Sequence, residues 1–285
     1  MMDGTLSPPQ SSDASSGAGG DGYVQPREFG AVNWLGLQTL YAREVRRFMK
    51  VGTQTLFAPV VSSLLFMVVF KLAFPERADV DGVPFGDFIA PGIVMMAILN
   101  NAFQNSSSSM TIAKVQGNTT DFLMPPLSSL ELATGFLAGA ATRGVLVGAV
   151  TLAVIGITGM ADISVAHWGA LIFYGLVGSV FMGAVGLMGG IWSDKFDHLA
   201  AVTNFVILPL TMLSGTFYPI SVFAEPFETL SHFNPFFHLI DGFRYAFVGE
   251  ADGDLLLGAG YALAITLGLC AASWLMLRSG YKLKA

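Results

Sequence analysis

Apolar residues along this chain gather in six long stretches separated by short polar connections. The stretches cover about residues 55–74, 85–107, 132–157, 168–192, 199–213 and 258–277. A helix needs about 20 residues, at roughly 1.5 Å each, to cross the roughly 30 Å hydrocarbon core of a bilayer. The fifth stretch is shorter than this, and the others reach it. The pattern therefore predicts an all-α integral membrane protein with six transmembrane helices.

The segment that follows the fifth stretch, residues 214–247, is apolar and aromatic but interrupted by proline. It is too broken for one straight helix, because proline removes a backbone donor and kinks or ends a helix. Irregular backbone at membrane depth is tolerated only where it is buried in protein or lines a cavity. We therefore expect a re-entrant helical pair at about 216–240, before the last span, rather than a seventh span.

Two segments precede the first span. Residues 1–26 are rich in Gly, Ser, Pro and Asp with almost no aliphatic side chains, so we expect a disordered cytoplasmic tail. Within residues 27–52, apolar side chains recur at helical spacing and basic side chains cluster towards the end. This pattern predicts an amphipathic helix lying in the membrane interface. The alternative is a solvated helix packed on a soluble core.

The composition agrees with a membrane protein and excludes several other classes. Of the 285 residues, 53% are hydrophobic and 12% charged, about half the charged share of an ordinary globular domain. The formal net charge of −6 opposes nucleic-acid binding, which depends on Lys and Arg neutralising phosphates. One cysteine excludes a disulfide framework and a four-cysteine zinc site within the chain. We therefore expect no nucleic-acid partner and no metal site.

Lysine and arginine near the ends of the spans predict the orientation, because cytoplasmic connections carry an excess of both. They concentrate before the first span, in the second-to-third and fourth-to-fifth connections, and at the C-terminus. These residues are Arg43, Arg46, Arg47, Lys50, Lys114, Lys195, Arg278, Lys282 and Lys284. Both termini are therefore expected in the cytoplasm, which agrees with six spans.

The sequence shows no catalytic constellation. It contains no GxxxxGKS/T phosphate loop, no HExxH zinc helix and no GxSxG nucleophile elbow. We therefore expect a protein that is not an enzyme. An ion-coupled carrier would be expected to place Asp or Glu near the membrane midplane, and no span has an obvious acid there.

Arg143 is an unusual charge within the third span. An ionisable side chain at that depth is costly and usually faces the bundle interior or a wet cavity. We therefore expect Arg143 to line a translocation path. The alternative is a structural role, in which Arg143 pairs with a carboxylate or with carbonyls at a helix end.

The connection between the second and third spans, AKVQGNTTDFLMPPLSSLELATGF, is the most informative segment. Asn118, Thr119 or Thr120 can cap a short helix over residues 121–124, and the Pro125–Pro126 pair stops it. Such a helix would present Phe122, Leu123 and Met124 on a cytoplasmic surface, where exposed apolar groups indicate a partner protein. The alternative is that these side chains dip into lipid headgroups.

Four segments together resemble a known family. They are REVRRFMK followed by a proline in the first span, AKVQGNTTDFLMPPLSSLELATGFLAGAATRG, PLTMLSGTFYPIS, and LSHFNPFFHLIDGFRYAFVG. In their order and spacing, from about residue 40 to 277, they resemble a permease subunit of the ABC-2 family of bacterial ATP-binding-cassette exporters, close to its YadH-like subfamily of inner-membrane permeases. The last two segments are the most specific.

The resemblance implies a six-span permease in the bacterial plasma (inner) membrane that works as a homodimer with two copies of a separate nucleotide-binding ATPase subunit. ATP and Mg would lie on that partner, and no cofactor is expected in this chain. The helix at about 117–126 would be the coupling helix that docks into the ATPase, beside a connecting helix in 27–52. These residues are Gly117, Asn118, Thr119, Thr120, Asp121, Phe122, Leu123, Met124 and Pro125, with Arg43, Glu44, Arg46 and Arg47 on the connecting helix.

The resemblance also assigns residues 216–240 to extracellular re-entrant helices that cap the translocation path. Aromatic side chains there would form an apolar gate, and the alternative is an aromatic belt at the membrane interface. These residues are Phe217, Tyr218, Phe233, Phe236 and Phe237.

The expected function is export of an amphiphilic or lipid-like substrate, such as a lipid, a lipid-linked glycan or a drug, out of the cytoplasm or the inner leaflet. Alternating access and lateral lipid extrusion both remain open as mechanisms. Two other classes also stay open: an ion-coupled secondary carrier or channel without an ATPase, and a membrane assembly or scaffold protein. Residues 53–285 would form the transmembrane domain.

Overall fold

A computed structural model describes residues 30, 32–73, 79–80, 82–222 and 224–283. The chain divides into two units, Met1–Val32 and Asn33–Ala285, and every helix and strand given below belongs to the second. The predicted disordered tail, residues 1–26, lies outside the described residues. The second unit is all-α apart from one short antiparallel hairpin, β1 (Asp79–Val80) with β2 (Val83–Pro84).

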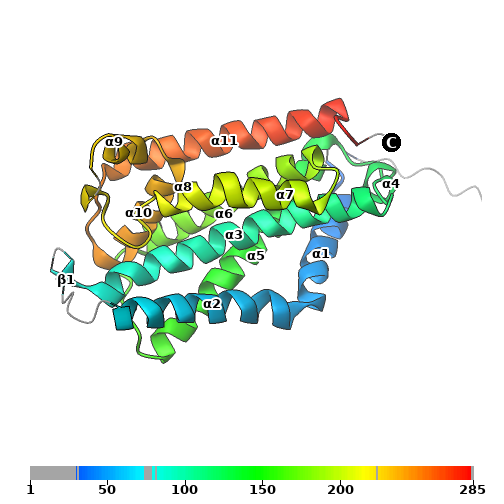
Figure 1. Ribbon diagram of the computed structural model, residues 1–285. Helices are drawn as coiled ribbons and strands as arrows, with labels where there is room; N and C mark the ends of the chain where they lie inside the picture. The colour runs from blue at the N-terminus through cyan, green and yellow to red at the C-terminus, as the bar shows by residue number, and fades with distance from the viewer. Residues whose placement is uncertain (1–29, 31, 74–78, 81, 223, 284–285) are drawn as a thin grey trace, which may run out of the picture. The chain divides into compact units, whose positions relative to one another are not determined.

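Five helices in the described part of the chain are long and apolar enough to cross a membrane. They are α2 (Gly52–Ala73), α3 (Phe85–Val115), α5 (Ser129–Ile157), α6 (Trp168–Trp192) and α11 (Leu255–Ser279), and they run alongside one another (Figure 1). Each coincides with a predicted span to within a few residues at its ends, except for α3. That helix continues past residue 107 to Val115. The hydroxyl of Ser107 bonds the Phe103 carbonyl of its own helix at 2.7 Å, so this polar side chain is satisfied within the helix.

The fifth predicted span is a shorter apolar helix, Phe196–Met212. It consists of α7 (Phe196–Val202), one π-helical turn, η1 (Thr203–Ile207), and α8 (Leu208–Met212). In the wide turn the Leu208 N–H bonds the Thr203 carbonyl. Pro209 follows directly and has no N–H to donate, so the regular ladder is broken at this point. The sequence pattern predicted the apolar stretch but not its wide turn.

Glycine residues let α6 pack closely on α3, which is the most buried of the long helices. A Cβ atom at Gly186 would overlap the Phe103 carbonyl, and one at Gly190 would lie 2.9 Å from the Ser107 carbonyl. Small residues at such positions let helix backbones approach closely in membrane proteins, where van der Waals packing drives association. The core of the bundle is therefore built around α3.

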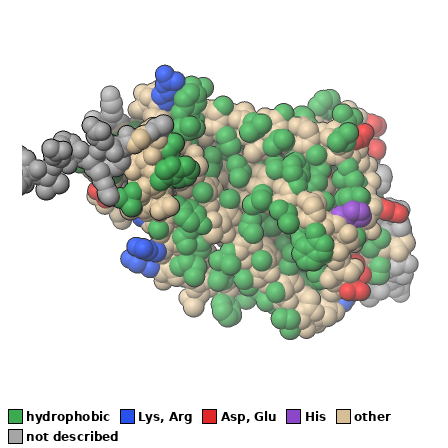
Figure 2. Space-filling view, turned by 180° about the vertical axis from the view of Figure 1, so that it is seen from behind, with side chains coloured by type: hydrophobic (Ala, Val, Ile, Leu, Met, Phe, Trp, Pro, Cys, Tyr) green, Lys and Arg blue, Asp and Glu red, His purple; other side chains and the backbone are tan. Residues whose placement is uncertain are grey.

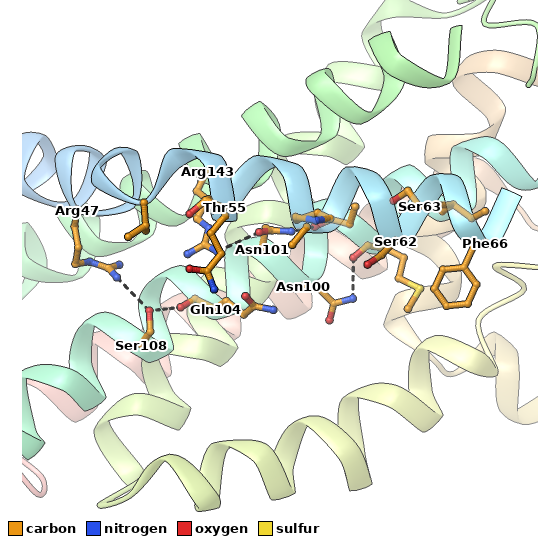
Figure 3. Close-up of a pocket in the computed structure, with 17 residues that line it drawn as sticks. Arg47, Thr55, Ser62, Ser63, Phe66, Asn100, Asn101, Gln104, Ser108 and Arg143 are labelled. Carbon is orange, nitrogen blue, oxygen red and sulfur yellow. Dashed lines mark hydrogen bonds between the residues drawn. The ribbon is translucent and has the colours of Figure 1, made fainter. Parts of the chain in front are cut away.

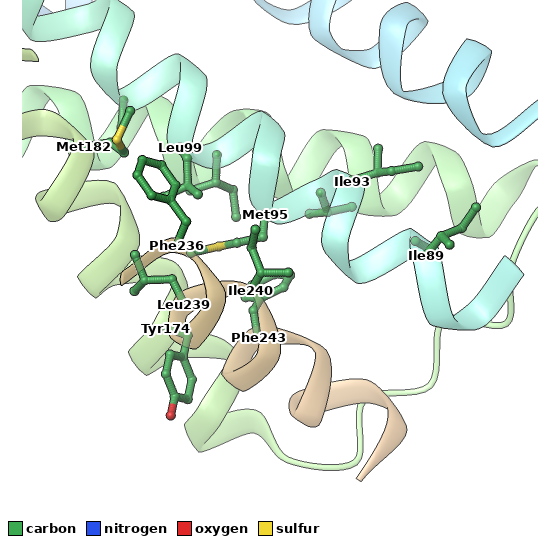
Figure 4. Close-up of a cluster of buried hydrophobic side chains, with 14 of the residues drawn as sticks. Ile89, Ile93, Met95, Leu99, Tyr174, Met182, Phe236, Leu239, Ile240 and Phe243 are labelled. Carbon is green, nitrogen blue, oxygen red and sulfur yellow. The ribbon is translucent and has the colours of Figure 1, made fainter. Parts of the chain in front are cut away.

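The segment that was predicted as a re-entrant pair forms η2 (Ile220–Val222), α9 (Phe227–His232) and α10 (Pro235–Val248). Asn234 caps α10 by accepting a bond from the Phe236 N–H at 3.0 Å, and Gly249 ends it with a φ of +82°. Apolar side chains of α10 join those of α3 and α6 in the core (Figure 4). These side chains are Phe236, Leu239, Ile240 and Phe243 of α10, Met95 and Leu99 of α3, and Tyr174 and Met182 of α6.

Most Lys and Arg side chains lie at one end of the helices and most Asp and Glu side chains at the other, with a broad apolar band between them (Figure 2). Exceptions include Asp194, which pairs with Lys282, and Arg244, which pairs with Asp252. We call the end where α2 begins and α11 stops the basic end. It carries Arg43, Arg46, Arg47, Lys50, Lys114, Lys195, Arg278 and Lys282. The other, acidic end carries Asp87, Asp162, Glu225, Glu228, Glu250, Asp252 and Asp254. This separation is the one on which the predicted orientation depends, and the orientation itself stays a prediction.

Candidate functional site

A one-turn helix, α4 (Thr120–Leu123), lies between α3 and α5 at the basic end, where a short helix was predicted. It follows Gly117, whose φ of +71° allows the chain to turn after α3. The helix stops before the two consecutive prolines, as predicted. The prediction that a side chain caps this helix was wrong, because the N-cap residue, Thr119, makes no hydrogen bond through its side chain to the start of the helix. Instead, the Asn118 N–H bonds the Ala113 carbonyl at 2.8 Å and closes the turn through the backbone.

The prediction that Phe122 lies on the surface was wrong. Its side chain is 3% exposed and its ring meets that of Phe136 in α5 edge to face, with 5.7 Å between centroids. A single turn cannot expose all its residues, and the largest apolar ring gains most from facing the bundle. The exposed apolar side chains here are Leu123 of α4 at 41% and Met124, its C-cap, at 82%, near exposed Asp121.

The predicted amphipathic helix is α1 (Trp34–Lys50), and it is joined to the loop after α4. The Asn33 N–H bonds a carboxylate oxygen of Glu131, and the Asn33 amide donates to the Pro126 carbonyl at 3.1 Å. Glu131 also forms a capping box with Ser128 at the start of α5. The start of α1 is thereby tied to the segment behind α4. The S-x-x-E pattern at 128–131 was a sequence signal for the start of α5, and it was overlooked.

Four predicted coupling residues of α1 divide between the surface and the interior. Arg43 and Arg46 are exposed. Glu44 is 1% exposed, accepts a bond from the Ser109 hydroxyl at 2.7 Å, and pairs with Arg47 at 3.0 Å. Arg47 also donates to the backbone and side-chain oxygens of Asn105. Glu44 and Arg47 therefore fasten α1 to α3, and buried Glu44 offers no surface to a partner.

Arg143 lines a cavity of about 510 Å³ between α1, α2, α3 and α5, which we call the polar cavity (Figure 3). One guanidinium nitrogen donates to the Asn101 side-chain oxygen at 3.2 Å. Within the described residues Arg143 forms no ion pair, so the structure supports a cavity-facing arginine rather than one paired with a carboxylate. The polar lining includes Arg47, Gln54, Thr55, Asn100, Asn101, Gln104 and Ser108.

The amide side chains of α3 were missed in the sequence. Asn100, Asn101, Gln104 and Asn105 fall within six residues of the second predicted span, NNAFQN. Three of them line the polar cavity and the fourth binds Arg47. Polar residues this closely spaced within an apolar stretch are costly in a membrane, and their density was a signal for the cavity.

The predicted aromatic gate residues lie in different surroundings. The Phe217 ring stacks on Phe70 of α2 with 4.8 Å between centroids and lies 5.8 Å from that of Phe66. Phe236 meets Phe181 of α6 edge to face. Phe233 is 69% exposed. The Tyr218 hydroxyl donates to the Met212 carbonyl of α8 at 2.9 Å, and buried Phe237 contacts the rings of His232 and His238. The gate stays a prediction, and Phe217, beside Phe66 of the polar cavity, fits it best.

Comparison with known proteins identifies the family. Residues 36–248 match the ABC-2 type transporter family. The chain is 30% identical to the inner membrane transport permease YadH of Escherichia coli K12 over 253 residues, which cover 88% of this chain and 98% of the relative. It is 24% identical to nodulation protein J of Neorhizobium galegae over 238 residues, or 81% of this chain and 87% of the relative. This chain therefore belongs to the ABC-2 type transporter family, as its sequence motifs indicated.

Proposed function

We propose that this chain is the transmembrane permease subunit of an ATP-binding-cassette exporter that moves an amphiphilic or lipid-like substrate out of the cytoplasm or inner leaflet. ATP and Mg would be bound by a separate ATPase subunit. The family membership and the relatives named as transport permeases support a transport role. The bacterial inner membrane is the proposed location, with six spans, both termini in the cytoplasm and the short helix Phe196–Met212 as the fifth span.

The observation that carries the proposal is the joined pair of α4 and α1 at the basic end. Leu123 and Met124 project from α4, and the segment just behind them is bonded to Asn33 at the start of α1. A partner that pushes on α4 would therefore move α1 and α5 together, through the Asn33–Glu131 bond and the Phe122–Phe136 contact. ATP can bias the permease only through contacts that differ between two states, and this surface supplies them.

The proposed assembly contains two permeases and two ATPase subunits. The two α4 helices would be driven together when the ATPases close on ATP, and the spans would then rearrange towards the far side. The apolar surfaces left on α2, where Phe57 is 70% exposed and Leu65 59% exposed, support contact with lipid or with a second permease.

The test is co-purification in mild detergent with a candidate ATPase encoded in the same locus, followed by ATPase activity in lipid nanodiscs. We expect a complex of two permeases with two ATPases, and at least about tenfold weaker ATPase binding in Met124→Asp, because a charge would enter an apolar contact. The matched control is Leu256→Asp, which alters a residue 85% exposed at the acidic end. Phe122→Asp is unsuitable because it would disrupt packing on Phe136.

Two results would oppose the proposal. A permease that binds no ATPase overturns the exporter and makes an ion-coupled carrier the function to test. A Met124→Asp variant that binds and stimulates the ATPase like the parent chain overturns the assignment of α4 as the coupling helix.

A further inference from the structure

The polar cavity follows two facing helix surfaces along much of their length. Its wall on α2 runs from Gln54 to Phe66, and its wall on α3 runs from Ser108 back to Ile93. Because the two helices are antiparallel, Arg47 and Ser108 mark the basic end of the cavity and Phe66 marks the other (Figure 3). Its volume of about 510 Å³ lies within the range of small-molecule sites.

The chemistry of the lining changes along this length. Towards the basic end it presents guanidinium, amide and hydroxyl groups, from Arg47, Arg143 and Gln104 among others. Towards the other end Phe66, Ile93 and Met96 add apolar side chains to the lining, beside the hydroxyl groups of Ser62 and Ser63. A ligand that fits both parts has a polar head and an apolar tail.

The charge in the cavity determines the sign of that head. Arg143 is 9% exposed, its Nε has no hydrogen-bond partner, and no Asp or Glu is among the described residues that line the cavity. The nearby acid, Glu44, is already bonded to Arg47 and Ser109. A buried charge is stable only when it is paired or hydrogen-bonded, so the uncompensated guanidinium of Arg143 favours an anion.

We propose that the polar cavity binds one anionic amphiphile, with a phosphate or carboxylate head at Arg143 and Arg47 and an apolar chain along α2 and α3 towards Phe66. A guanidinium presents parallel N–H donors that match such a head in two bonds, and the amides of Asn100 and Gln104 supply further donors. This inference rests on the proposed function only in taking the amphiphile to be the transported substrate. Binding itself needs no ATPase.

The experiment measures lipid binding by the full chain in nanodiscs of zwitterionic phosphatidylcholine. Short-chain fluorescent phosphatidylglycerol is the anionic probe, and phosphatidylcholine with the same chains and fluorophore is its control. We expect saturable binding of about one phosphatidylglycerol per chain and weaker binding of the control. Arg143→Gln should weaken phosphatidylglycerol binding at least about tenfold, because charge-assisted bonds are lost. Arg278→Gln, which changes an exposed arginine near the end of α11, should leave it unchanged.

Two further variants separate binding from folding. Arg143→Lys keeps the charge and should retain part of the preference for the anionic lipid. Ala58→Phe fills the cavity from the α2 wall and should weaken both lipids while Arg143 stays in place. If Arg143→Gln does not yield folded protein, Ala58→Phe and Arg143→Lys carry the test. Equal binding of the two lipids by the parent chain, or unchanged phosphatidylglycerol binding in Ala58→Phe, would overturn the inference.

Inorganic phosphate distinguishes the source of the anion. Excess phosphate should not displace the bound lipid, because it lacks the apolar chain. Displacement by phosphate alone would indicate a site for a soluble anion and overturn the lipid assignment. Since no ATPase is present, failure here leaves the exporter untouched, and an exporter that fails its own test leaves this binding result intact.

Discussion

The guanidinium of Arg244 lies 3.9 Å from the ring centroid of Phe88, which places a buried cation of α10 over the first turn of α3. Arg244 also donates to the backbone carbonyls of Phe88 and Gly215 and pairs with Asp252 at 3.6 Å. One side chain therefore joins α10 to α3 and to the turn after α8. The short helices at the acidic end are fixed to the core through it.

Replacing Arg244 by methionine should destabilise the fold. The change keeps an apolar stem but removes the bonds to the Phe88 and Gly215 carbonyls and the pairing with Asp252, and we expect a loss of about 3 kcal/mol. The measurement is the thermal midpoint in detergent, followed by size-exclusion chromatography. Arg278→Met is the control, since Arg278 is exposed near the end of α11. Equal midpoints for the two variants would show that Arg244 does not fix α10.

The ion pair between Glu44 and Arg47 should show strong coupling in a double-mutant cycle. Glu44→Gln leaves Arg47 without its counter-charge, and Arg47→Gln leaves a carboxylate that is 1% exposed beside only Ser109. Each single variant leaves a buried group without its partner, whereas the double variant removes both groups. We therefore expect the double variant to lose about 1 to 3 kcal/mol less free energy of unfolding than the two single losses added together. Additive losses in denaturant unfolding would mean that the pair does not act as a unit.

The sequence predicted those features that depend on length and local composition. Trp168–Trp192 has the predicted bounds because both ends are marked by a change from apolar to polar residues. Pairings between distant segments were not predictable in this way. The bond from Arg143 to Asn101 joins residues 42 positions apart, and only the packing of α5 on α3 brings them together. The burial of Phe122 has the same cause, since one turn of helix has too few residues to reveal which side faces the bundle.

Asp194 should make the fold sensitive to acid. Lys282 and Lys114 bond its two carboxylate oxygens at 3.0 and 3.1 Å, and these bonds hold the pKa of Asp194 below its ordinary value. Because the folded-state pKa is the lower one, the stabilisation is present above the unfolded pKa of about 3.9 and is lost as the pH falls through the folded value.

The predicted effect of Asp194 is small, because the pair is exposed and screened by solvent. Asp194→Asn should lower the thermal midpoint slightly near neutral pH and reduce its fall below about pH 5. Glu250→Gln, an exposed acid at the opposite end, should keep the parent's pH profile. If Asp194→Asn leaves the dependence of the thermal midpoint on pH unchanged, the pairing of Asp194 with Lys282 and Lys114 is not a source of acid sensitivity.

Two glycine-to-alanine changes should separate helix packing from helix propensity. A Cβ at Gly186 of α6 would overlap the Phe103 carbonyl and come within 2.6 Å of the Ser106 hydroxyl, whereas Gly268 of α11 has nothing within 4 Å. Gly186→Ala should therefore push α6 away from α3 and cost about 1 to 3 kcal/mol. Gly268→Ala should be neutral or stabilising by up to about 1 kcal/mol, because alanine favours the helix. Gly186→Ala would also displace the Ser106 hydroxyl, which donates a hydrogen bond to the Gly183 carbonyl of α6 at 2.6 Å. Thermal midpoints of both variants in one detergent test this, and a tolerated Gly186→Ala would show that α3 and α6 can separate without loss.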